Sequence, residues 1–158
     1  MTNVSQFSPE MFLDMSLDAP TERRAPLPTD RDYMAIVGDV KARAWSTEKN
    51  GGKSGIAWDV PLVIDVPAEL QEALALPDTL KLSDSIMLDL TDNGAIDNSK
   101  GKNSRLRQYR EACDLNKVGD SFSARRMTGK VIKVRIKHEI YPEGSDNILE
   151  KIGAVAKG

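Results

Sequence analysis

Apolar and polar residues alternate along several segments of this chain, and a period of two is typical of a β-strand with one buried face. The alternation is clearest over residues 130–141 and nearly as regular over 56–66. A polar, glycine-rich turn at 46–55 predicts that the first two strands form a hairpin. The predicted strands are 33–45, 56–66, 85–91, 130–141 and 147–156.

Each alternation also predicts which side chains face the core. In the first strand, the row that contains Met34 and Ile36 is expected to point inward, and the row that contains Tyr33 and Trp45 outward. In the second strand, Trp58 belongs to the inward aliphatic row. In the fourth strand the isoleucines and valines are expected to be buried. Its outward face then carries Lys133, Arg135 and Lys137.

Glycine and proline residues predict where the strands bend, where they lie at an edge and where the folded domain begins. Gly38, in the middle of the first strand, predicts a bulge or a sharp bend. Pro61 predicts an edge position or a bulge for the second strand, because proline has no N–H to give to a ladder. Several prolines near the N-terminus predict an extended arm over residues 1–31, followed by one folded domain over 32–158.

One helix is predicted between the third and fourth strands. Residues 103–114 place Leu106, Tyr109 and Cys113 on one face at helical spacing. A shorter helical segment is expected to begin at Pro67. The order of three strands, one helix and two strands is typical of the oligonucleotide/oligosaccharide-binding (OB) fold. We therefore expect a mostly β protein with a five-stranded, OB-fold-like Greek-key barrel.

Composition excludes several classes of function. The 158 residues include one cysteine and one histidine, which excludes an internal disulfide and a multi-histidine metal site. The sequence has no apolar run long enough to predict a membrane span. The N-terminal residues also lack the pattern of a secretory signal peptide, so we expect a cytoplasmic protein. Gly52-Lys53-Ser54 lacks the preceding glycine and the following helix of a nucleotide-binding loop. We expect no enzymatic activity, no cofactor and no metal.

The formal net charge of −2 hides an uneven distribution of charge. Residues 1–97 carry 8 Lys and Arg against 17 Asp and Glu, residues 98–137 carry 12 against 3, and residues 138–158 carry 2 against 4. The middle segment therefore has an excess of nine positive charges. Such an excess is typical either of a surface that faces phosphate groups or of a solvated face that pairs with the acidic part.

Binding of single-stranded nucleic acid needs a basic groove along the backbone and aromatic rings that stack on the bases. The outward faces of the first and fourth strands, the turn at 46–55 and the helix supply such residues. The candidate nucleic-acid-binding residues are Tyr33, Lys41, Arg43, Trp45, Lys49, Lys53, Arg105, Arg107, Lys133, Arg135, Lys137 and Tyr141. Alternatives stay open, since the aromatic residues can pack against the body and the helical arginines can lie on a solvated face.

Four stretches of the sequence are similar to a family of small phage-encoded proteins of replication and recombination modules, regarded as OB-fold single-stranded-DNA-binding proteins. The stretches are ERRAPLPTDRDYMAIVGDV, IAWDVPLVIDV, NSRLRQYREACDL and MTGKVIKVRIKHEIYPEGSDNILEKIGAVAK, within residues 22–156. The resemblance implies DNA binding without catalysis, in the cytoplasm of a host cell. Many similar proteins end in an acidic tail that recruits partners. This chain does not, so recruitment would fall to another segment, such as the acidic N-terminal arm.

The leading hypothesis is non-catalytic, largely sequence-independent binding of single-stranded DNA in phage replication or recombination. The expected partners are single-stranded DNA and other replication or recombination proteins, with no membrane; self-association stays open. The alternative is an OB-fold module for protein–protein interaction or assembly, in which the basic strand meets an acidic partner.

Overall fold

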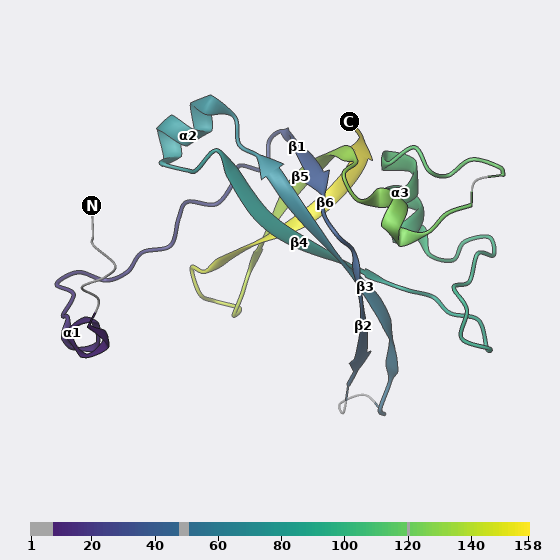
Figure 1. Ribbon diagram of the computed structural model, residues 1–158, viewed down its shortest axis with the longest axis horizontal. Helices are drawn as coiled ribbons and strands as arrows, with labels where there is room; N and C mark the ends of the chain where they lie inside the picture. Colours follow the sequence, from purple (N-terminus) through teal and green to yellow (C-terminus); the bar gives the residue numbers. More distant parts are fainter. Residues whose placement is uncertain (1–7, 48–50, 120) are drawn as a thin grey trace.

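The computed structural model describes residues 8–47, 51–119 and 121–158, and its body is a six-stranded antiparallel sheet (Figure 1). In chain order, the elements are α1 (Pro9–Asp14), β1 (Asp32–Val37), β2 (Lys41–Ser46), β3 (Ser54–Asp65), α2 (Ala68–Leu74), β4 (Thr79–Met87), α3 (Ser104–Ala112), the 3-10 helix η2 (Ala124–Met127), β5 (Val131–Ile140) and β6 (Ile148–Lys157). The strand order is β2-β3-β1-β5-β6, and β4 also pairs with β3. The sheet is open. The mostly β class is confirmed, whereas the closed five-stranded barrel is not.

The first predicted strand is interrupted in its middle. β1 pairs with residues 62–64 of β3 and β2 pairs with residues 54–59, so a short gap separates the two ladders. At this gap the Gly38 N–H donates to the Pro61 carbonyl at 2.8 Å. Pro61 lies opposite the gap between β1 and β2, so no neighbouring strand has an acceptor for the N–H that proline lacks. The bend expected at Gly38 is present, but Pro61 lies in an interior strand rather than at an edge.

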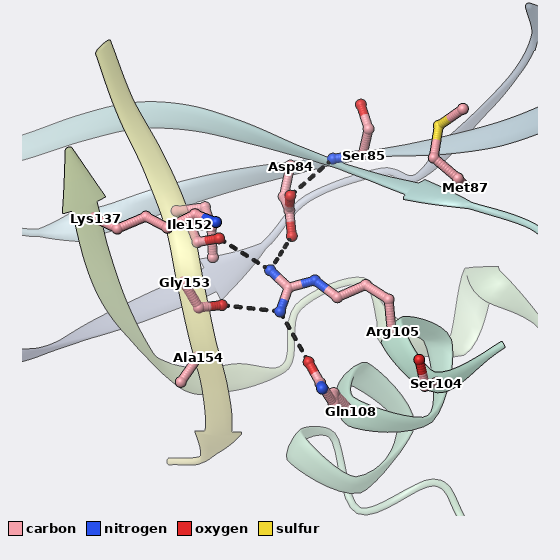
Figure 2. Close-up of a pocket in the computed structure, with 10 residues that line it drawn as sticks. All are labelled: Asp84, Ser85, Met87, Ser104, Arg105, Gln108, Lys137, Ile152, Gly153 and Ala154. Carbon is pink, nitrogen blue, oxygen red and sulfur yellow. Dashed lines mark hydrogen bonds and ion pairs between the residues drawn. The ribbon is translucent and has the colours of Figure 1, made fainter. Parts of the chain in front are cut away.

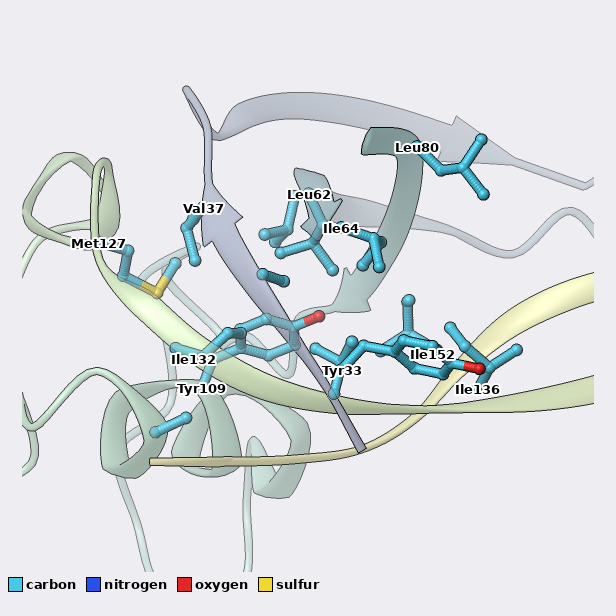
Figure 3. Close-up of a cluster of buried hydrophobic side chains, with 14 of the residues drawn as sticks. Tyr33, Val37, Leu62, Ile64, Leu80, Tyr109, Met127, Ile132, Ile136 and Ile152 are labelled. Carbon is cyan, nitrogen blue, oxygen red and sulfur yellow. The ribbon is translucent and has the colours of Figure 1, made fainter. Parts of the chain in front are cut away.

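The buried face of β1 is the opposite of the predicted one. Tyr33 is 1% exposed, whereas Met34 and Ile36 are 39% and 48% exposed. Both rows of β1 are apolar enough to be buried, so alternation alone does not select between them. Tyr33 packs in the core (Figure 3), and its hydroxyl donates to the Pro28 carbonyl at 2.7 Å. Tyr33 is therefore not the exposed stacking residue that the sequence predicted.

The other strands bury most of the side chains that alternation predicted. These residues share an aliphatic side chain that points into the hydrophobic core. They include Val60, Leu62 and Ile64 of β3 and Ile132, Val134 and Ile136 of β5. Ile140, at the end of β5, is exposed. β4 begins six residues before the predicted strand because it pairs with β3 all along Thr79–Met87.

The N-terminal arm has two parts that differ in their contacts. Residues near Leu27 are fixed on the body, because the Leu27 N–H donates to the Glu150 carboxylate at 2.7 Å and its carbonyl accepts from His138 Nε2 at 2.8 Å. The Leu27 side chain is fully buried. Helix α1, with Pro9 in its first turn, lies apart from the sheet (Figure 1) and buries none of its residues. The arm is thus extended only in part.

Candidate nucleic-acid interface

The side chain of Arg105 bridges the open seam between β4 and β6 (Figure 2). No backbone ladder joins these two strands in the described part of the chain. Arg105 Nη2 donates to Asp84 Oδ2 at 2.6 Å and to the Ile152 carbonyl at 3.1 Å. Nη1 donates to the Gly153 carbonyl at 2.8 Å and to Gln108 Oε1 at 2.9 Å. The guanidinium thereby satisfies carbonyl groups that a neighbouring strand would otherwise bind.

Asp84 holds this arrangement together from the β4 side. The Tyr109 hydroxyl donates to Asp84 Oδ2 at 2.6 Å, and the Tyr109 ring is fully buried. Burial, and then the nearby Asp84 charge, raise the pKa of Tyr109, so the phenol stays a neutral donor. The Asp84 and Arg105 side chains are 16% and 27% exposed. The positive charge of Arg105 is therefore offset within the chain, which makes it a structural residue here.

A cleft of about 600 Å³ lies over this bridge, and we call it the seam cleft. It is bordered by β4 on one side, by β6 and the adjacent part of β5 on another, and by the first turns of α3. Its lining residues are Asp84, Ser85, Met87, Ser104, Arg105, Gln108, Lys137, Ile152, Gly153 and Ala154. Lys137 is exposed and makes no ion pair with any described residue. It is the one uncompensated cation that lines this cleft in the described structure.

The outward face of the β2–β3 hairpin continues into the seam cleft. Arg43 binds the Asp59 carboxylate with two donors, Nε at 2.9 Å and Nη2 at 3.2 Å. The Ser85 hydroxyl donates to the same carboxylate at 2.8 Å, and Ser85 also lines the cleft. The hydrogen bond from Arg43, and then that from Ser85, lower the pKa of Asp59. Arg43 therefore lies next to the cleft, but its charge is partly compensated.

Trp45 lies further along the same hairpin. Its Cα pairs with Gly55, and its ring covers that glycine so closely that a Cβ there would lie 2.7 Å from the ring. The side chain is half-buried, which is consistent with either stacking or packing. Lys41 and Lys53 are exposed on β2 and in the adjoining turn. Lys49 lies outside the described residues.

The basic face of β5 is present as predicted, but only part of it reaches the seam cleft. Lys133 is exposed and pairs across the sheet with Met34 of β1. Arg135 is bound to Asp32 at 3.0 Å, so its charge is offset. β1 and β3 separate β5 from β2 in the sheet. The structure therefore brings Lys137 to the cleft and leaves Lys133 and Arg135 on a separate outward surface.

The last two predicted residues lie away from these groups. Tyr141 is 66% exposed and follows the end of β5. Arg107 is exposed on α3 at 3.9 Å from Glu111, and it lines a second cleft beside the loop that precedes α3.

Sequence reasoning selected Arg105 but missed its partner Asp84 at the floor of the seam cleft. Asp84 continues the inward row of Ile86 and Leu88 by two residues, and a carboxylate on an inward row needs a buried partner. That pattern, together with an arginine at the start of the predicted helix, was the available indication. Ser85 lay at the predicted beginning of the strand, and Met87 on its outward row, but neither was expected to border a cleft.

A metal site and a membrane-spanning helix are both absent from the described residues. In 8–47, 51–119 and 121–158, no group of three or more His, Cys, Asp or Glu side chains could hold a metal ion. Within the same ranges, no helix is long and apolar enough to cross a membrane. A scan against protein-family models and searches of curated proteins and of solved structures returned no match.

Proposed function

We propose that this protein binds single-stranded DNA without catalysis, along the outward face of the β2–β3 hairpin and through the seam cleft. The observation that carries the proposal is the uncompensated Lys137 in a cleft that continues into the face of Arg43 and Trp45. A cation in a groove attracts backbone phosphates, and the release of counterions drives such binding. A ring beside the groove adds stacking that tolerates any base.

The connectivity of the strands supports an OB-like fold for this function. β1 and β2 together correspond to one long bent strand, followed by β3, β4, helix α3, β5 and β6. β1 pairs with β5 and β5 with β6, as a Greek-key barrel requires. In this proposal the remaining seam, between β4 and β6, is closed by the Arg105 bridge instead of a ladder.

The test is a fluorescence-anisotropy titration of a labelled mixed-sequence 30-mer as single-stranded DNA, duplex DNA and single-stranded RNA, at low and physiological salt. We expect the tightest, salt-dependent binding for single-stranded DNA. Lys137→Glu should weaken that binding about threefold and reduce the log–log salt slope by about 0.7, the contribution of the one phosphate that is no longer bound. Lys81→Glu makes the same change of charge outside the cleft and serves as the control.

Two results would contradict the proposal. Absence of binding by the wild type at low salt would exclude nucleic-acid binding altogether. Equal weakening by Lys137→Glu and Lys81→Glu would show that only the net charge matters and that the seam cleft is not the site.

A second candidate function is assembly between copies of the chain. Met34, Ile36 and Val131 form an exposed apolar strip across β1 and β5, beside Lys133. The segment around α1 has a complementary composition, with exposed Met11, Phe12 and Leu13 and only acidic charges over residues 8–22. Sedimentation velocity would test this function. The wild type should form oligomers, and Ile36→Ser with Val131→Ser should convert them to monomers. A monomeric wild type would exclude assembly between copies.

A further inference from the structure

A second cleft lies beside the loop that leads into α3, and we call it the loop cleft. Its volume is about 290 Å³, and it is lined by residues 96–103 of the loop, by Ser104, Leu106, Arg107 and Arg110 of α3, and by Asn116. The loop is held in place by Asn103, which is 7% exposed. Its side chain accepts from the Asp89 N–H at 2.8 Å and donates to the carbonyls of Asp89 and Asp97. The shape of this cleft is therefore fixed by a satisfied, buried side chain.

The loop cleft is strongly basic. Its cationic lining residues are Lys100, Lys102, Arg107 and Arg110, against one carboxylate, Asp97. Lys100 and Lys102 make no ion pair with any residue in the described ranges. Asp97 accepts from both the backbone and the hydroxyl of Ser99, at 2.9 and 2.6 Å. These bonds, more than the nearby charge of Lys102, lower the pKa of Asp97, and the carboxylate makes no ion pair with either lysine.

The two arginines differ from the lysines in their contacts but keep their charge available. Arg107 is paired only at 3.9 Å with Glu111, and both side chains are about 60% exposed (62% and 59%). Such an exposed pair contributes little. Arg110 donates through Nε to the Leu115 carbonyl, a neutral acceptor, and its guanidinium lies 4.5 Å from the centre of the Phe122 ring. Neither contact offsets a full positive charge.

The loop cleft adjoins the seam cleft. Ser104, the first residue of α3, lines both of them. Lys137 lines the seam cleft, and Lys100 and Lys102 line the loop cleft. A chain of phosphate groups that leaves the seam cleft past Ser104 enters the cleft of these two lysines.

We propose that the loop cleft is a second phosphate-binding site, which takes phosphodiester groups of the same single strand after it passes the seam cleft. This inference rests on the proposed function. It extends the binding surface beyond the sheet and assigns ligand contacts to Lys100 and Lys102, which the sequence pattern did not single out.

The test compares three variants in titrations with a labelled 20-mer of deoxythymidine at several salt concentrations. We expect Lys100→Glu with Lys102→Glu to weaken binding about tenfold and to reduce the salt slope by about 1.4. Lys137→Glu reports on the seam cleft, and Lys81→Glu with Lys117→Glu is the charge-matched control of the loop variant, at positions that line neither cleft. Circular dichroism confirms that each variant is folded.

A second readout locates the contact. In the wild type, adding the 20-mer should shift the backbone amide resonances of Gly101 and Lys102. The inference alone is overturned if the loop variant binds like the control while the seam variant is impaired, or if these amides do not shift at saturation. Absence of binding by the wild type overturns the inference together with the proposed function.

Discussion

The seam cleft and the loop cleft share Ser104, yet they use their basic residues differently. In the seam cleft, Arg105 lies at the floor and its donors bind a carboxylate, an amide and two carbonyls of the chain itself. In the loop cleft, Lys100 and Lys102 are exposed and without ion pairs among the described residues. Arg105 therefore stabilises the fold and leaves Lys137 as the uncompensated cation of the seam cleft, whereas the two lysines of the loop cleft are both without ion pairs among the described residues.

This difference has a physical origin. A guanidinium has several donors in a rigid plane, which suits it to bridge fixed acceptors on three elements at once. An exposed ammonium remains hydrated and mobile, and it attracts phosphate without a fixed geometry. A count of positive charges in the sequence does not separate these roles, because the separation depends on which cations face a carboxylate.

The largest expected effect comes from breaking the bridge at the seam. Arg105→Ala removes four hydrogen bonds and leaves the shielded Asp84 unpaired, so we expect a loss of about 2–4 kcal/mol in the free energy of unfolding. Arg107→Ala, on the exposed face of the same helix, should change it by less than about 0.5 kcal/mol. Urea denaturation measures both. Arg105→Lys should not rescue stability, and equal losses at Arg105 and Arg107 would contradict the structural role of the bridge.

A smaller effect is expected from the second donor to Asp84. Tyr109→Phe keeps the buried ring and removes only the hydroxyl, which should cost about 1–2 kcal/mol of unfolding free energy. Tyr141→Phe is the matched control, because Tyr141 is 66% exposed. The same urea titrations measure the two variants. A Tyr109→Phe protein as stable as the wild type would mean that Arg105 alone satisfies Asp84 Oδ2, while the Ser85 N–H still donates to Oδ1.

Local patterns in the sequence predicted most of the strands but not how the sheet ends. β3, β5 and β6 follow from alternation, and α3 follows from the spacing of Leu106 and Tyr109. The faces of β1 were assigned wrongly, because the decisive contact of Tyr33 is with Pro28, in the arm, and alternation contains no information about the arm. The open seam depends on long-range contacts between β4, α3 and β6, which no local pattern reports.

The candidate site was predictable only in part for the same reason. Lys137 was selected from the outward face of its strand, and the structure places it in a cleft. Arg43 and Arg135 were selected by the same reasoning, and Arg105 was selected from the predicted helix, but each faces a carboxylate that is distant in sequence. Lys100 and Lys102 stood in a segment expected to be only a loop, so their shared cleft was not foreseen.

The smallest expected effect concerns Arg43, whose charge is partly compensated where it borders the proposed path of the DNA. Asp59→Asn removes the partner of Arg43 and should strengthen binding of single-stranded DNA roughly two- to fivefold at low salt, with a slope steeper by up to about 0.7. Anisotropy titration measures the change. Asp65→Asn, an exposed position on the same strand, is the control with the same change of charge. Equal strengthening by both variants would assign the effect to net charge instead of Arg43.

The pH dependence of DNA binding gives a second test of the pair formed by Arg43 and Asp59. The pKa of Asp59 is lowered in the folded protein, so its carboxylate stays ionised and keeps Arg43 compensated throughout pH 5–8. The contribution of this pair to the free energy of unfolding is complete above the pKa of Asp59 in the unfolded chain. It is lost only as the pH falls through the lower pKa of Asp59 in the folded protein. Wild-type affinity should therefore be the same at pH 5 and pH 8, and so should that of Asp59→Asn, at its higher level. An affinity of the wild type that rises to the level of the variant by pH 5 would mean that Asp59 is protonated there and that Arg43 does not hold its charge.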